Sequence, residues 1–131
     1  MKTKPAYDLE ERTACFGEAV IEWCLGITET AINRPLITQL VRSATGVGAN
    51  YCEADEAESK ADFRHKIALC RKESKETKYW CRMLAKAVSQ EAPALRVLWT
   101  EAGELHLIFC KIIRTTDAGL RRKNPAASSR A

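Results

Sequence analysis

Residues 36–84 constrain the fold of this chain more than any other segment. Apolar and small residues recur there every three or four positions, which is the spacing of one face of an α-helix. Polar residues stand beside these positions with the same spacing, so they flank the face that would be buried. Such regular polar rows indicate an internal polar network or an interface, and they do not indicate a catalytic pocket.

Helical periodicity and capping signals together predict four helices and no strand. Asp8 and Ser59 each precede an acidic residue by three positions, as an N-cap does, and Pro35 and Pro93 suit helix starts. Short links force consecutive helices to pack antiparallel, so we expect an all-α, up-down-up-down four-helix bundle. The expected helices span about 8–29, 35–57, 60–88 and 93–116.

The residues expected in the core recur at helical spacing in each of these segments. Gly46 and Gly48 interrupt the second helix at a cost of about 1 kcal/mol each relative to Ala, which predicts close approach of another helix or subunit. The predicted stripes are Leu9, Phe16, Val20, Trp23 and Ile27; Leu36, Leu40, Ser43, Val47, Asn50 and Ala54; Phe63, Ile67, Cys70, Ser74, Thr77, Cys81, Leu84 and Val88; and Leu95, Leu98, Ala102, Leu105, Phe109 and Ile112.

A length of 131 residues predicts one domain, which we place at 1–118, followed by a basic tail at 119–131 that we expect to be disordered. No apolar run approaches the roughly 20 residues of a membrane helix, and the first residues lack an apolar signal region. We therefore expect a cytoplasmic protein without a membrane partner. The six cysteines form no Cys-x-x-Cys pair, so we expect them to be reduced thiols packed as small apolar groups.

The net charge of +4 hides an asymmetry between the two halves of the chain. Residues 1–60 carry 6 Lys and Arg against 10 Asp and Glu, whereas residues 61–131 carry 15 against 7. The basic half could attract a polyanion, or it could attract the acidic half of a neighbouring subunit.

Much of the basic charge falls in one narrow sector of the third helix. Cations at helical spacing with no acid interleaved in the same sector favour contact with RNA or DNA phosphates, although a solvated helix face is the common alternative. The residues of this basic stripe are Arg64, Arg71, Lys75, Lys78 and Arg82, with Lys86 at its edge.

Two polar rows border the apolar stripes of the second and third helices. Charges beside a core are half-buried and need partners. The rows therefore predict either a polar site that holds the helix register or binds a ligand, or ordinary salt bridges between and within helices. The residues of this polar network are Gln39, Arg42, Asn50, Glu53, Lys66, Glu73 and Glu76.

Metal and catalytic patterns are weak in this sequence. A di-iron bundle needs Glu-x-x-His on two helices and two further carboxylates, and only Asp62 with His65 approaches that pattern. His106 and Cys110 are four residues apart, but no further ligand accompanies them. We expect no metal, no cofactor, no catalytic residue and no enzymatic activity.

The polar runs resemble a known bacterial family, the four helix bundle proteins, which include proteins encoded in intervening sequences of 23S ribosomal RNA genes. Residues 39–54 (QLVRSATGVGANYCEA) look like the signature of the family's second helix. Residues 63–67 (FRHKI) and 72–80 (KESKETKYW) look like that of its third helix. The resemblance covers about residues 8–116, and the sequence is also similar to the accessory variability proteins of diversity-generating retroelements.

This resemblance implies a homopentameric antiparallel bundle with no known catalysis. It also implies, through the retroelement proteins, binding to a reverse transcriptase and to nucleic acid through basic surfaces. Two hypotheses follow for this chain. The first is a non-enzymatic oligomeric accessory protein that binds RNA or DNA, and the second is a purely structural homo-oligomer or protein-interaction module without a nucleic-acid role.

Overall fold

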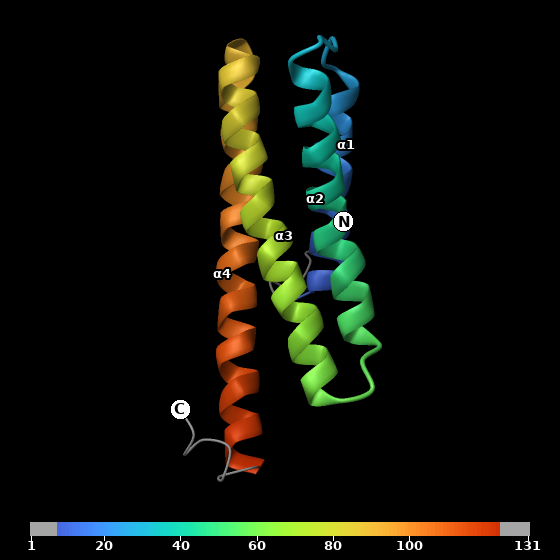
Figure 1. Cartoon of the computed structure of the whole chain (residues 1–131), viewed down its shortest axis with the longest axis vertical. Helices are drawn as coiled ribbons and strands as arrows, with labels where there is room; N and C mark the ends of the chain where they lie inside the picture. Colours follow the sequence, from blue (N-terminus) through green and yellow to red (C-terminus); the bar gives the residue numbers. More distant parts are fainter. Residues whose placement is uncertain (1–7, 124–131) are drawn as a thin grey trace, which may run out of the picture.

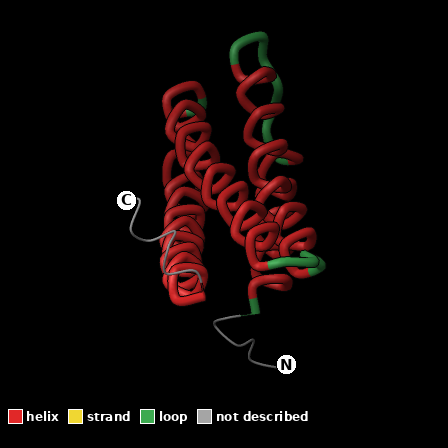
Figure 2. The backbone as a smooth tube through the Cα atoms, turned by 60° about the horizontal axis from the view of Figure 1, so that its bottom comes forward, coloured by secondary structure: helices red, strands yellow, loops and turns green. Residues whose placement is uncertain are grey.

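A computed structural model describes residues 8–123 of the protein, and within that range every regular element is helical (Figures 1 and 2). The all-α four-helix prediction is confirmed. The helices are α1 (Leu9–Leu25), α2 (Asn33–Asp55), α3 (Lys60–Ala87) and α4 (Ala92–Lys123), with a single 3₁₀ turn, η1 (Ser89–Glu91), between α3 and α4.

The predicted N-caps of α1 and α3 are confirmed by their hydrogen bonds. The Asp8 carboxylate accepts from the backbone N–H of Glu11 at 3.2 Å, and the Ser59 hydroxyl accepts from the N–H of Asp62 at 3.0 Å. Each bond satisfies one of the N–H groups that the first turn of a helix leaves unpaired. Both helices therefore start within one residue of the predicted position.

Other helix ends differ from the prediction. The first helix stops at Leu25 before Gly26, rather than near residue 29, and the second begins at Asn33 rather than at Pro35. Asn33 and Thr30 bond reciprocally, each side chain accepting from the other residue's N–H, at 2.8 and 3.1 Å. This local pair fixes the helix start two residues before the proline.

The fourth helix continues to Lys123 instead of ending near residue 116. Residues 119–123, which we expected to belong to a disordered tail, form its last turn, and the rest of that predicted tail lies outside the described residues. Three cations in this turn, Arg121, Arg122 and Lys123, complement the partial negative charge at a helix C-terminus.

The helices alternate in direction along the chain, and α3 is the central element (Figure 1). It packs along both α2 and α4, whereas α1 packs mainly on α2 and meets α4 at only a few positions. Polar side chains link α1 to the other edge of the bundle. Arg12 forms a two-pronged ion pair with Glu101 of α4 at 2.8 and 2.9 Å, and the Trp23 indole donates to Glu91 at 2.8 Å.

Most residues of the predicted core stripes are buried, whereas Trp23, Ile27, Leu36, Asn50 and Phe63 are only half-buried. Ser43, Ser74 and Thr77 are buried, and the Thr77 hydroxyl donates to that of Ser43 at 2.9 Å across the α2–α3 contact. On α4 it is Ile113 that is buried, while the predicted Ile112 is only half-buried. Within the described residues, no helix is long and apolar enough to span a membrane.

Candidate nucleic-acid interface

The basic stripe lies on the flank of α3 that faces α4. Asp117 of α4 holds Arg64, Trp99 of α4 lies under the ammonium of Lys78, and the backbone carbonyl of Arg71 contacts His106 Nδ1 at 3.2 Å. The remaining cations of the stripe are exposed: Lys75, Arg82 and Lys86. The stripe is therefore a ridge beside the α3–α4 contact, and the side chains of Arg64 and Lys78 are held against the neighbouring helix.

Within the ridge, Arg64 pairs with a carboxylate, that of Asp117 on α4. Its Nε and Nη2 donate to the two Asp117 oxygens at 3.0 and 3.3 Å. The hydrogen bond from Arg64 is the main reason that the pKa of Asp117 lies below its ordinary value, and the charges of Arg64, Arg121 and Arg71 lower it further. Asp117 thus offsets part of the positive charge, which sequence spacing on α3 alone did not reveal.

Lys78 has its side chain laid across α4. Its ammonium lies 4.3 Å from the centroid of the Trp99 ring, a cation–π contact. The end of the side chain passes over Gly103, where an added β-carbon would be in ordinary van der Waals contact with it at 3.6–3.7 Å. The charge of Lys78 is therefore held at a fixed place on the α3–α4 surface.

Further cations from α4 extend the basic ridge at both ends. Near the α3 start, Lys60 lies so close to Lys123 and Arg122 that they lower its pKa. At the other end, Arg82 and Arg96 line one pocket between the two helices. The acids Glu101 and Glu104 of α4 instead face Arg12 of α1. Together these residues form what we call the basic face: Lys60, Arg64, Arg71, Lys75, Lys78, Arg82, Lys86, Arg96, Arg121, Arg122 and Lys123.

The polar network is divided between separate pairs on the α2–α3 side. Arg42 Nη2 lies 3.6 Å from Glu76, and the same guanidinium donates to Gln39 Oε1 at 3.2 and 3.3 Å. Lys66 pairs with Glu53 at 3.0 Å. The Asn50 amide instead donates to the Gly46 carbonyl, at 2.8 Å. The side chain of Arg42 is 62% exposed, so this part of the network is a surface feature.

Glu73 differs from the other members of the polar network. It is half-buried, and burial is the main cause of a pKa raised above the ordinary glutamate value, with repulsion from Glu76 adding to it. Its carboxylate packs against Gly46, and the charges of Arg42 and Lys72 offset only part of the effect of burial on its pKa. A desolvated carboxylate of this kind reduces stability near neutral pH.

The polar residues considered for metal binding do not converge. His65 is exposed. The Sγ of Cys110 is 3.6 Å from the Nε2 of His106, but no third potential ligand joins this pair within the described residues. No group of three or more potential metal ligands occurs within residues 8–123. The cysteines of this range are free thiols, and burial raises the pKa of Cys70 and of Cys81 to about 12.

Comparison with known proteins matches residues 15–108 to the 23S rRNA-intervening sequence proteins. The chain belongs to this family. The matched range contains the whole of α2 and α3, where both signature-like runs lie, so the resemblance seen in the sequence is confirmed.

A solved structure of the same kind supports the fold. It is a 1.70 Å crystal structure from Bacteroides thetaiotaomicron, described as a protein with unknown function from the S23 ribosomal protein family. The two chains share 25% identity with a TM-score of 0.70 over 79% of this chain and 96% of the other. No curated protein matches the chain.

Proposed function

We propose that this protein is a non-enzymatic accessory protein that binds nucleic acid through the basic face. The observation that supports this most is the arrangement of charge: α3 and α4 carry the eleven cations of the basic face, and Asp117 pairs with one of them, Arg64. Contacts with phosphates release counterions, so a ridge of this kind favours binding to the backbone of any nucleic acid. The polar groups of the face are cations suited to binding, which is why the proposal includes no catalysis.

Fluorescence anisotropy with labelled duplex DNA and structured RNA at two salt concentrations tests the proposal. Replacing Lys75, Arg82 and Lys86 with Glu should weaken binding and reduce its salt dependence, because these exposed side chains lie on the basic face. The matched control reverses Arg34, Arg42 and Lys72, which are exposed residues not assigned to the face, and changes the net charge equally. Equal losses in the two triple variants, or no binding of the parent at low salt, would reject the proposal.

A second candidate function is self-assembly, which exposed apolar side chains favour. Leu25 is 83% exposed and Ile32 71% at one end of the bundle, and Val97 and Leu107 are nearly as exposed on α4. Exposed apolar surface of this kind marks interaction sites. The family resemblance favours a pentamer, and it makes a reverse transcriptase a candidate protein partner.

Charge complementarity provides a further reason to propose assembly. A groove between α1 and α2 is lined by Glu10, Glu11 and Glu18 beside the small Gly17 and Gly48, whereas the α3–α4 side is basic. Static light scattering at micromolar concentration tests assembly directly. A monomer of 14.7 kDa would reject it, and an assembled protein that ignores nucleic acid would leave the structural homo-oligomer as its function.

A further inference from the structure

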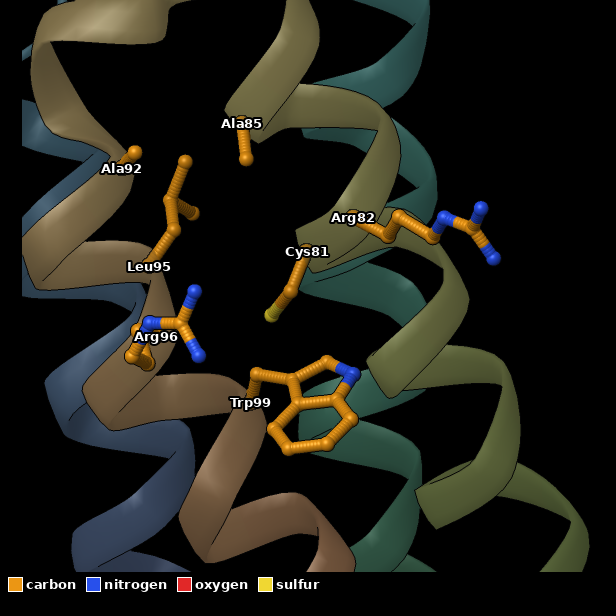
Figure 3. A pocket seen from close by; sticks show the side chains of 7 residues that line it. All are labelled: Cys81, Arg82, Ala85, Ala92, Leu95, Arg96 and Trp99. Carbon is orange, nitrogen blue, oxygen red and sulfur yellow. The ribbon is translucent and has the colours of Figure 1, made fainter.

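A pocket of about 370 Å³ opens between α3 and α4 near the turn that joins them (Figure 3). Its floor is apolar: Cys81 and Leu95 are each 1% exposed, and Ala85 and Ala92 complete it. Burial raises the pKa of the Cys81 thiol to about 12, so the floor is uncharged near neutral pH. No carboxylate is among the residues that line this pocket.

The remaining lining residues are two arginines and a tryptophan. Figure 3 shows the guanidinium of Arg96 on the α4 side of the Cys81 sulfur and the Trp99 ring, whereas the Arg82 side chain points away from the other lining residues. Trp99 is 40% exposed, and Lys78 places a further cation 4.3 Å from its ring centroid. The pocket therefore joins an apolar slot, an accessible aromatic ring and the positive charges of Arg96 and Lys78.

This combination fits the two parts of a nucleotide. A base needs a flat apolar contact, and base–aromatic stacking accepts every base because each has a π-face. A phosphate needs cations, and the guanidinium group donates two parallel hydrogen bonds to its oxygens. A purely apolar ligand would use the floor but leave the guanidinium group of Arg96 without an anionic partner.

Resting on the proposed nucleic-acid function, we propose that this pocket holds one unpaired nucleotide of a single strand. The base lies against Trp99 and the apolar floor, and its phosphate lies beside Arg96. Bases within a duplex are stacked and paired, so they do not reach such a slot. The pocket thus gives the protein a preference for single-stranded segments, while the basic face binds any phosphate backbone.

The test compares three labelled 15-residue DNA probes by fluorescence anisotropy: a single strand, a strand of the same length made of abasic sites, and a blunt duplex. The abasic strand keeps the phosphates and removes the bases. We expect the parent to bind the normal strand about tenfold more tightly than the abasic strand. Trp99→Ala should bring the ratio of these two affinities close to one and leave the affinity for the duplex within about twofold of the parent's.

Arg96→Gln provides a second variant that keeps the tryptophan in place, and it should weaken the single strand more than the duplex. Leu107→Ala and Arg34→Gln are the matched controls, since both residues are exposed and neither lines the pocket. These control variants should leave the ratio of the affinities for the normal and the abasic strand unchanged. Circular dichroism on each variant separates loss of binding from loss of fold.

The outcomes distinguish the pocket from the basic face. Equal affinity of the parent for normal and abasic strands, with salt-dependent binding of all three probes, overturns the pocket and keeps the proposed function. A ratio that Trp99→Ala does not change also overturns the pocket. Absence of binding to every probe at low salt rejects the proposed function and the pocket together.

Discussion

The carboxylate of Glu73 on α3 lies so close to Gly46 on α2 that a β-carbon at position 46 would be 2.5 Å from Glu73 Oε2. The glycine in the helix interior therefore makes room for a side chain. Gly48 does the same for α1, because a β-carbon there would be 3.3 Å from the Thr13 hydroxyl oxygen. The predicted close approach at these glycines is made by side chains of neighbouring helices.

Gly46→Ala should be more favourable when Glu73 is shortened. Alanine improves helix propensity by about 1 kcal/mol, but in the parent it displaces the Glu73 carboxylate. In a Glu73→Ala background the gain should appear in full, so the two substitutions should couple by about 0.5 kcal/mol or more. Urea denaturation of the four proteins measures the coupling, and strictly additive values would show that the contact does not limit position 46.

Glu73→Gln should raise the melting temperature at pH 7. Burial raises the pKa of Glu73 in the folded protein, so the folded state binds its proton more tightly than the unfolded state does. The resulting loss of stability is absent below the unfolded pKa of about 4.3, develops as pH rises through the folded pKa, and is complete above it. The parent and the variant should therefore melt alike near pH 3.5 and differ at pH 7; the opposite order would contradict the assignment.

Much of the fold was predictable because it depends on local signals. The stripe of α3 from Ile67 to Leu84 is buried as its spacing indicates, and the side chains of Asp8 and Ser59 cap their helices. The start of α2 was predicted less well, since the proline signal at Pro35 is local but the bonds between Thr30 and Asn33 decide the boundary.

The candidate site was predictable on α3 and not across helices. Helical spacing grouped the cations of the basic stripe, but it carried no information about Asp117, which lies 53 residues after its partner Arg64. It also could not show that Arg96 and Trp99 of α4 would meet Arg82 around a pocket. These contacts depend on the register between α3 and α4, which packing of the whole bundle sets.

Arg12→Ala should destabilise the protein more than Arg42→Ala. Arg12 makes two hydrogen bonds to Glu101 with a side chain only 25% exposed, and it links α1 to α4, where few other contacts exist. We expect Arg12→Ala to lower the free energy of unfolding by about 1–2 kcal/mol, and the change at the exposed Arg42 to lower it by less than about 1 kcal/mol. Chemical denaturation of both variants checks the order, and equal losses would mean that the two pairs are equivalent.

Thiol accessibility should separate the cysteines by burial. Cys52 is exposed, whereas Cys70 and Cys81 are buried with pKa values raised to about 12. Because the thiolate is the reactive form, Cys52 should react with a thiol reagent in the native protein, and Cys70 and Cys81 only after unfolding. Mass spectrometry of peptides after timed labelling measures this, and early labelling of Cys81 would contradict the packing around it.

Asp117→Asn should strengthen nucleic-acid binding. The substitution removes the carboxylate that pairs with Arg64 and leaves that guanidinium available for a phosphate. One added phosphate contact steepens the slope of log affinity against log salt by about 0.9 for a duplex. Glu22→Gln on α1 is the control, because it changes the net charge equally at an exposed position on another helix. The pair with Arg64 is partly exposed, so its loss should change stability by less than about 1 kcal/mol.

Anisotropy titrations of duplex DNA at several salt concentrations give both slope and affinity. If Asp117→Asn behaves like Glu22→Gln in both, Arg64 does not contact the backbone, and the interface lies elsewhere on the basic face.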